Sequence, residues 1–417
     1  MSPLRTPAAT RRRRASGPLI ALLAVLLTVL ALEVGFRLAH FDFEFKAQAF
    51  NRLPIFCRQP VLAVGPAFFR RPGPDRWHGQ VLRTCDRTNG GSDDAYRDEP
   101  VVTITYDGQG FRNPPDLRDW DVAVVGDSFT ELGYLPYEDL FTTRLGDLRK
   151  LRVKNLGVSY TGTLTQTLYL KEYGKAPSTT DAVLVFFEGN DVLDIALEHQ
   201  ALERAQHGEP PSGPPATRLE TLPRQSSLLT AAYRFLAGQS PAAPQSARSF
   251  EGLKNWTAAD FVWDGTRTPL TVDYVVPSSR DLPAEARSLV VGAIVGWRET
   301  AKALGLRPWL AYMPCKRRVL DGYLTATDGQ PLPVVQSDLL EFVRGIATGA
   351  GIRFVDLTPG LRRETDGGRL TYNAIRDTHL NRLGSWTVGE ALATALARDS
   401  GGREPPDFSL TDRDPKR

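Results

Sequence analysis

The sequence is poor in the residues that build metal centres and disulfide frameworks: 3 cysteines and 5 histidines in 417 residues. Cys57, Cys85 and Cys315 form no Cys-x-x-Cys pair. This spacing argues against a structural zinc site and against a disulfide-dense scaffold. A single bridge between Cys57 and Cys85 remains open.

The chain also lacks a basic surface. Its formal net charge is +3, but five arginines before residue 15 supply more than this excess, and the remainder carries 46 basic against 48 acidic residues. We therefore expect no nucleic-acid partner. With 41% hydrophobic and 24% charged residues, the composition is that of a globular protein, and it excludes a wholly disordered chain and a polytopic membrane protein.

One long apolar run stands out, at residues 18–39, and the arginine cluster precedes it. Roughly 20 apolar residues are needed to cross a bilayer as a helix. Because no Ala-x-Ala cleavage pattern follows, we favour an uncleaved transmembrane anchor, with a removed signal peptide as the alternative. The positive-inside rule then makes residues 1–17 a cytoplasmic tail. We expect a single-pass protein of the cytoplasmic membrane, with its main domain in the periplasm or exterior.

The remaining chain divides by pattern. Residues 40–110 read as a connector with one strand at 101–106, residues 111–400 as the main domain, and residues 401–417 as a flexible tail. In the main domain short β-branched runs alternate with amphipathic helices, which predicts a parallel sheet covered on both faces. The predicted strands are 122–125, 153–156, 182–187, 308–313 and 352–357, and the predicted helices are 137–150, 163–173, 284–304, 339–349 and one that starts near residue 381.

An insertion at about 192–283 interrupts this alternation. It is too long for an ordinary crossover, so it predicts a lid or subdomain. Its aromatic residues Trp256, Phe261 and Trp263 either stack on a sugar ring or pin the insertion to the body. We favour packing, which is the commonest use of buried aromatic area.

Polar residues follow the first three strands at the edge where parallel sheets collect ligands. Ser128 follows the first strand in Gly126-Asp127-Ser128, Gly157 follows the second, and Asn190 follows the third. Asp377 and His379 stand before the last helix and could supply the base that a serine nucleophile needs. Each block alone is weak evidence, because Gly-Asp-Ser can be an ordinary helix cap. His379 has the stronger case, since His40, His78, His199 and His207 fall in the anchor end, connector or insertion.

Taken together and in this order, the four blocks resemble the SGNH hydrolases, the GDSL-type esterase superfamily. The resemblance runs from about residue 110 to 397, and the segments 106–113 and 314–319 also look like membrane-anchored members of this group. It implies a three-layer α/β/α sandwich with a flavodoxin-like parallel sheet of about five strands. It implies no metal and no cofactor.

The mechanism that the resemblance implies is acyl transfer through an acyl-serine. Ser128 would attack the ester carbonyl, His379 would act as base and Asp377 would orient its ring. The oxyanion hole would comprise the N–H groups of Ser128 and Gly157 and the side chain of Asn190. The family's terminal block often reads Asp-x-x-His, whereas one residue separates Asp377 from His379. If Asp377 cannot reach the ring, a dyad of Ser128 and His379 remains.

Several functions fit this chemistry. We expect an esterase that acts on acyl esters, first of all O-acetyl esters of a carbohydrate or lipid-linked substrate. One alternative is an O-acetyltransferase that modifies a cell-envelope polysaccharide and receives acyl groups from a multispanning partner. Another is a non-catalytic glycan-binding subunit. A metal hydrolase ranks last, because His379 alone near several carboxylates is a poor ligand set for zinc.

Overall fold

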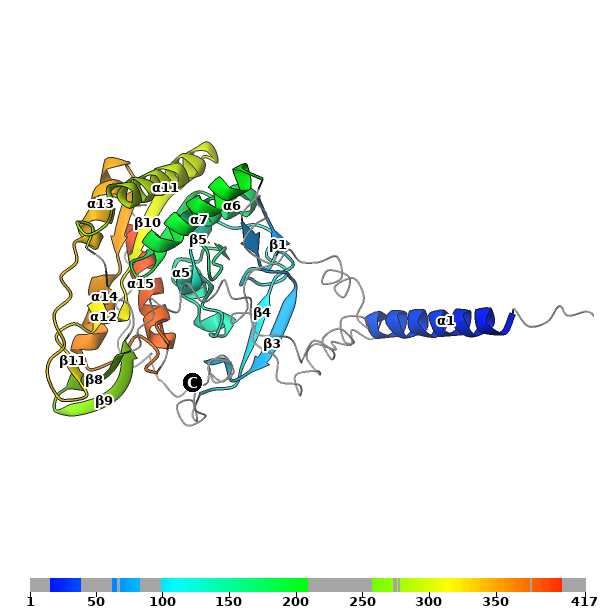
Figure 1. Ribbon diagram of the computed structural model, residues 1–417, viewed down its shortest axis with the longest axis horizontal. Coiled ribbons are helices and arrows are strands. Elements are labelled where there is room, and N and C mark those ends of the chain that lie inside the picture. The colour runs from blue at the N-terminus through cyan, green and yellow to red at the C-terminus, as the bar shows by residue number, and fades with distance from the viewer. Residues whose placement is uncertain are drawn as a thin grey trace, which may run out of the picture. The chain divides into compact units, whose positions relative to one another are not determined.

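The computed structural model describes residues 16–38, 62–65, 68–82, 99–208, 257–272, 276, 278–375 and 377–399 (Figure 1). The chain separates into two compact units, Met1–Asn51 with Ala216–Pro241, and Arg52–Pro215 with Ala242–Arg417. Cys57 and Cys85 lie outside the described residues, so the bridge between them is untested.

The first unit contains helix α1 (Ser16–Leu38). Its described leucine and valine side chains are exposed, for example Leu23 at 59% and Leu30 at 59%. Within the described ranges, no helix meets the length and apolarity that a membrane crossing requires. The membrane anchor stays a prediction.

The second unit is built on a five-stranded sheet with the order β12-β10-β7-β5-β6, in which every pairing is parallel. In chain order this is 2-1-3-4-5, the doubly wound flavodoxin-like arrangement. Every residue of β5 and β7 is buried, which explains why both strands are continuous apolar runs. The strands are β5 (Val122–Val125), β6 (Val153–Asn155), β7 (Asp181–Phe187), β10 (Arg307–Met313) and β12 (Arg353–Asp356). The predicted parallel sheet of five strands is confirmed.

Two groups of helices cover this sheet. Helix α11 packs against α6, α7 and α13, while α15 packs against α5 and α14; Figure 1 shows α6, α7 and α11 side by side. Right-handed crossovers in a 2-1-3-4-5 sheet place α5 and α6 on opposite faces. The result is the expected three-layer sandwich. The helices are α5 (Phe141–Arg149), α6 (Thr163–Tyr173), α7 (Asp191–Gln206), α11 (Ala284–Ala303), α13 (Leu339–Gly349), α14 (Thr358–Asp366) and α15 (Arg382–Asp399).

The connector forms two small antiparallel pairs. One joins β1 (Leu62–Ala63) to β2 (Phe69–Arg70), and the other joins β3 (Asp75–Gly79) to β4 (Val102–Tyr106). The strand expected at 101–106 is therefore present. Ile104 and Tyr106 are buried in the main hydrophobic core, so β4 belongs to the body of the unit and is not a loose linker.

The insertion contributes a second sheet. Strands β8 (Thr257–Trp263) and β9 (Thr266–Val272) form a hairpin, and β11 (Leu324–Ala326) joins its edge. Phe261 is 3% exposed and its ring lies 5.8 Å from that of Tyr323. The Trp263 indole N–H donates to the Asp366 carbonyl at 3.1 Å. Phe261 thus packs into the body, as expected. Trp263 is held by its hydrogen bond but is 38% exposed, and Trp256 lies outside the described residues.

Candidate active site

The nucleophile block forms a sharp turn between β5 and the short helix α4 (Ser128–Glu131). Asp127 caps this helix, and its carboxylate accepts the Phe129 N–H at 2.8 Å. A Cβ on Gly126 would lie 2.1 Å from the Thr130 hydroxyl, so only glycine fits at that position. The turn buries Asp127 and Phe129 but leaves Ser128 partly accessible, with its hydroxyl 3.4 Å from the Asp127 carboxylate. This is a suitable setting for a nucleophile that must meet a substrate.

Asp377 contacts His379 despite the short spacing between them. Its Oδ1 lies 2.6 Å from His379 Nδ1 and accepts the His379 backbone N–H at 3.0 Å. Because an ionised carboxylate only accepts hydrogen bonds, Nδ1 carries the proton and Nε2 is the basic nitrogen. The arrangement with Asp377 as orienter is present, and a backbone carbonyl is not needed in that role.

Ionisation of Asp377 is secured by its neighbours. Burial acts to raise the pKa of Asp377, but the charge of His379, hydrogen bonds from its ring and backbone, and the charge of Lys316 outweigh burial and bring this pKa to about 2. The Asn373 amide donates to the second carboxylate oxygen at 2.8 Å. Asp377 is therefore an anion throughout the pH range in which enzymes work.

Phe129 links the histidine to the nucleophile block. Its ring stacks on Phe187 at 3.8 Å between centroids and lies 4.9 Å from the imidazole of His379. Since Ser128 and Phe129 are adjacent, this contact brings His379 beside the nucleophile turn, about 250 residues away in the chain. The charge of His379 also acts to lower the pKa of Asp127. The two halves of the predicted site thus meet at the carboxyl end of the sheet.

Asn190 follows β7 and caps α7 at the same edge. Its Nδ2 donates to the Asp194 carboxylate at 2.5 Å, and hydrogen bonding from Asn190 and Ser128 acts on Asp127. Asn190 Oδ1 is buried, with no partner in the described part of the chain. Asn190 therefore lies next to the nucleophile turn, where the sequence predicts it.

Gly157 lies in the loop that follows β6, as the sequence predicts. Its N–H donates to the Asn155 side chain at 2.8 Å, so it is engaged within the chain. A Cβ on Gly157 would lie 2.4 Å from the Glu131 nitrogen. Glycine is required here because the loop after β6 passes against α4, and the oxyanion role of Gly157 stays a prediction.

Tyr160, three residues further along this loop, was missed by the sequence analysis. Two hydrogen bonds hold this loop. The Ser159 N–H donates to the Glu131 carboxylate on α4, and the Gly162 N–H donates to the Glu198 carboxylate on α7. Ser128 begins α4 and Asn190 precedes α7, so Tyr160 lies in the segment that joins these two sides of the site. In the described ranges, the N–H groups of Tyr160 and Ser128 donate to no protein acceptor.

The backbone of Tyr160 is in the left-handed region, at φ 66°, and its side chain is 56% exposed. A non-glycine residue there costs on the order of 1 kcal/mol or more, and such strain gathers at functional sites. No signal in the sequence marks Tyr160. Asn155, two residues before Gly157, indicates only that the Gly157 N–H is bound, because an Asn side chain often accepts from the N–H two residues ahead.

Lys316, at the start of α12 (Lys316–Val319), supports the loop that carries Asp377. The side chain is 1% exposed, and its ammonium donates to the carbonyls of Asp377 and, at 2.9 Å, Thr271. Thr271 lies on β9 and donates its own N–H to Ala374 at 2.9 Å. The inserted hairpin thus braces the Asp377–His379 loop.

Comparison with known proteins returns distant structural similarity. No protein-family model matches the chain, and no curated protein matches it. A putative lipolytic protein of the G-D-S-L family from Desulfitobacterium hafniense is 14% identical over 66% of this chain and 99% of its own, with a TM-score of 0.32. A G-D-S-L lipolytic protein from Veillonella parvula is 12% identical over 67% and 98%, with a TM-score of 0.35. An acetylxylan esterase from Geobacillus stearothermophilus is 12% identical over 69% and 97%, with a TM-score of 0.33.

Because these identities and TM-scores are low, the site rests on the geometry of the chain itself. The sheet order 2-1-3-4-5, the serine turn after β5, Asn190 after β7 and the Asp377–His379 pair before α15 are its distinguishing features. The fold that these features occupy is the flavodoxin-like three-layer α/β/α sandwich.

Proposed function

We propose that the protein is a serine esterase that cleaves acyl esters through an acyl-enzyme on Ser128. His379 takes the proton of the Ser128 hydroxyl as the oxygen attacks the ester carbonyl, and returns it to the leaving alcohol. Asp377 holds the ring and stabilises the imidazolium. Water then attacks the acyl-serine by the same proton route, which releases the acid and restores the free serine.

The observation that carries this proposal is the Asp377–His379 contact of 2.6 Å beside the turn that presents Ser128. The carboxylate and imidazole are 7% and 10% exposed at the side chain. Burial at this level strengthens their electrostatic interaction relative to water. The pair leaves Nε2 as the nitrogen that can serve a neighbouring hydroxyl.

The oxyanion would be bound by the N–H groups of Ser128 and Tyr160 and by the Asn190 amide. Donors of this kind stabilise the charge that develops on the carbonyl oxygen, and one donor contributes about 3 kcal/mol to the transition state. The Asn190 amide would have to turn partly from Asp194 toward the substrate, or share its two N–H groups between them.

As substrate class we propose O-acetyl esters of a carbohydrate. The exposed ring of Tyr160 offers an apolar surface beside the proposed oxyanion site, which suits an acyl or sugar face. The similarity to acetylxylan esterases agrees with this choice but is too distant to carry it. Membrane anchorage through residues 18–39 remains part of the proposal, on the ground of the apolar run there and the arginine cluster that precedes it.

The test is hydrolysis of 4-nitrophenyl acetate and of acetylated xylo-oligosaccharides by the full chain. We expect turnover that is lost in Ser128→Ala, while thermal denaturation shows that this variant is folded. Acetyl balance separates the alternatives: free acetate supports the esterase, and acetyl transfer to added unacetylated oligosaccharide supports the transferase. No Ser128-dependent reaction with either acceptor would leave a glycan-binding role and overturn the proposal.

A further inference from the structure

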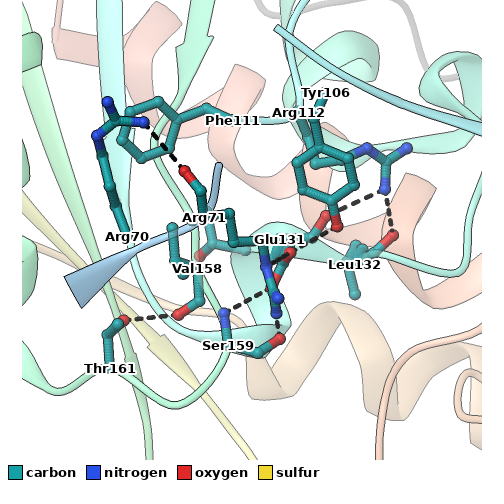
Figure 2. A network of polar contacts seen from close by, with 12 residues as sticks. Arg70, Arg71, Tyr106, Phe111, Arg112, Glu131, Leu132, Val158, Ser159 and Thr161 are labelled. Atoms are coloured by element: carbon teal, nitrogen blue, oxygen red, sulfur yellow. Dashed lines mark hydrogen bonds and ion pairs between the residues drawn. The ribbon is translucent and has the colours of Figure 1, made fainter. Parts of the chain in front are cut away.

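A buried ionic cluster connects the nucleophile helix to the loop of Tyr160. Glu131, in the same helical turn as Ser128, is fully buried, and so is Arg71 at 1% exposure. The guanidinium of Arg71 contacts both carboxylate oxygens, with Nη2 donating at 3.0 Å. Figure 2 shows this pair at the centre of the network. Such a pair needs further hydrogen bonds to offset its desolvation.

Those hydrogen bonds come from two other segments of the chain. The Tyr106 hydroxyl on β4 donates to Glu131 at 2.5 Å. The backbone N–H and hydroxyl of Ser159 donate to it at 2.6 and 2.5 Å. A single carboxylate therefore joins α4, the connector and the loop after β6 (Figure 2). Ser159 is the residue immediately before Tyr160.

The charge state of this cluster does not vary in the physiological range. Burial acts to raise the pKa of Glu131, but the charge and hydrogen bonds of Arg71 outweigh it and the pKa is lowered. Burial raises the pKa of Tyr106 well above its ordinary value. Glu131 is thus a permanent anion and Tyr106 a permanent donor, as a fixed support requires.

The contact between α4 and the loop is also tight at the backbone. Gly157 passes so close that a Cβ on it would meet the nitrogen of Glu131 at 2.4 Å, and the Val158 N–H donates to the Gly126 carbonyl at 3.1 Å. The loop is therefore fixed on both sides of the nucleophile turn. Its left-handed residue, Tyr160, follows directly after the Ser159 contact.

We propose that Glu131, held by Arg71, is a positioning residue that sets the Tyr160 N–H against the nucleophile turn. This inference rests on the proposed esterase function. Glu131 does not touch the substrate; it acts through Ser159. It also gives the connector a part in catalysis, because Arg71 and Tyr106 both precede the main alternating domain. Displacing a positioned group by about 1 Å can cost on the order of a hundredfold in rate.

The experiment compares two double variants that both remove the buried charges. Glu131→Gln with Arg71→Met keeps an oxygen that accepts the Ser159 N–H, while Glu131→Leu with Arg71→Met does not. We expect the Gln variant to stay within about tenfold of the wild-type kcat and the Leu variant to lose on the order of a hundredfold in kcat with KM changed less than about threefold. Equal kcat in the two variants would overturn the proposal.

Controls separate positioning from loss of stability. Arg307→Met removes the ion pair to Asp181 at the opposite end of β7 and β10, and should lower the melting temperature with kcat unchanged. If the Leu variant does not fold, Glu131→Asp replaces it, since it keeps the charge but withdraws the acceptor from Ser159 by one methylene. A folded Glu131→Asp with wild-type kcat overturns the positioning role.

The esterase function is checked in the same assay by Ser128→Ala. If Ser128→Ala loses turnover while the Leu variant keeps the full kcat, the positioning role of Glu131 is rejected and the esterase function stands. Wild-type protein without turnover rejects both.

Discussion

Asp377 Oδ1 binds both the ring Nδ1 and the backbone N–H of His379, at 2.6 and 3.0 Å, although a single residue separates the two. The extra backbone bond closes a small local loop, so the carboxylate faces back onto the ring of its own segment. The wider spacing of Asp-x-x-His is therefore not needed to orient the imidazole.

Asp377→Asn tests this relationship. The amide can keep the shape, but it can donate to Nδ1 and so favours the wrong imidazole tautomer. We expect kcat/KM for 4-nitrophenyl acetate to fall at least a hundredfold. Because the pKa of Asp377 is about 2, the deficit should be the same from pH 5 to pH 9. A loss below tenfold, or one that disappears at high pH, contradicts the assignment.

The titration of Asp127 should make the free energy of unfolding depend on pH. Burial raises the pKa of Asp127 from 3.8 to about 6. Between these values the folded chain holds a proton that the unfolded chain releases, so this group's contribution to the free energy of unfolding falls as pH rises from about 4 to about 6. The change is on the order of 2–3 kcal/mol.

Asp127→Asn removes this titration and keeps an N-cap of similar quality. Urea denaturation at pH 4, 5 and 6 should therefore show a flatter pH dependence for the variant than for the wild type. Parallel pH profiles for the two proteins would show that Asp127 does not titrate in this window.

Two substitutions in the loop after β6 should differ in their effect on the free energy of unfolding. Gly157→Ala places a methyl group 2.4 Å from the Glu131 nitrogen, and we expect it to lower the free energy of unfolding by about 2–3 kcal/mol. Tyr160→Gly relieves a left-handed φ while loosening the unfolded chain, so these effects largely cancel and the change stays within about 1 kcal/mol.

Tyr160→Gly should also change the kinetics of ester hydrolysis. Tyr160→Gly retains its N–H, and kcat should stay within about tenfold, while KM for the acetylated oligosaccharide rises as the exposed ring is lost. The measurement compares KM in the wild type and in Tyr160→Gly for two substrates, the acetylated oligosaccharide and methyl acetate. Methyl acetate is too small to reach the ring. Equal changes in both values would exclude a ring contact with the substrate.

Asn190 should contribute through its side-chain amide. We expect Asn190→Ala to lower kcat on the order of a hundredfold with the fold retained. Asp194→Asn is the matched control, because it alters the partner of Asn190 Nδ2 and leaves the amide in place. If both variants lose the same activity, the Asn190 side chain acts through its hydrogen bond to Asp194 and does not bind the oxyanion.

The sequence predicted the fold where burial leaves a continuous mark. β5 and β7 are apolar throughout because both of their faces are covered, and α6 was located at its observed bounds of Thr163–Tyr173. The strand ends followed from these elements, so the sequence could place Ser128 after β5 and Asn190 after β7; their catalytic roles stay predictions.

Other parts of the site left no such mark. Arg71, Glu131 and Lys316 are buried charges, and in a sequence they look like solvent-exposed charges. Gly157 was assigned to the oxyanion hole from the resemblance to the SGNH hydrolases, and nothing in the local sequence indicates its close approach to α4. The left-handed residue Tyr160 follows directly after the tertiary contact between Ser159 and Glu131, and no local pattern encodes that contact.

The most direct measurement is intact mass after treatment of the full chain with a fluorophosphonate, followed by peptide mapping. We expect one adduct per chain, on the peptide that contains Ser128. It should be absent in Ser128→Ala and form at least a hundredfold more slowly in His379→Ala. An unmodified chain, or an adduct that persists in Ser128→Ala, would contradict it.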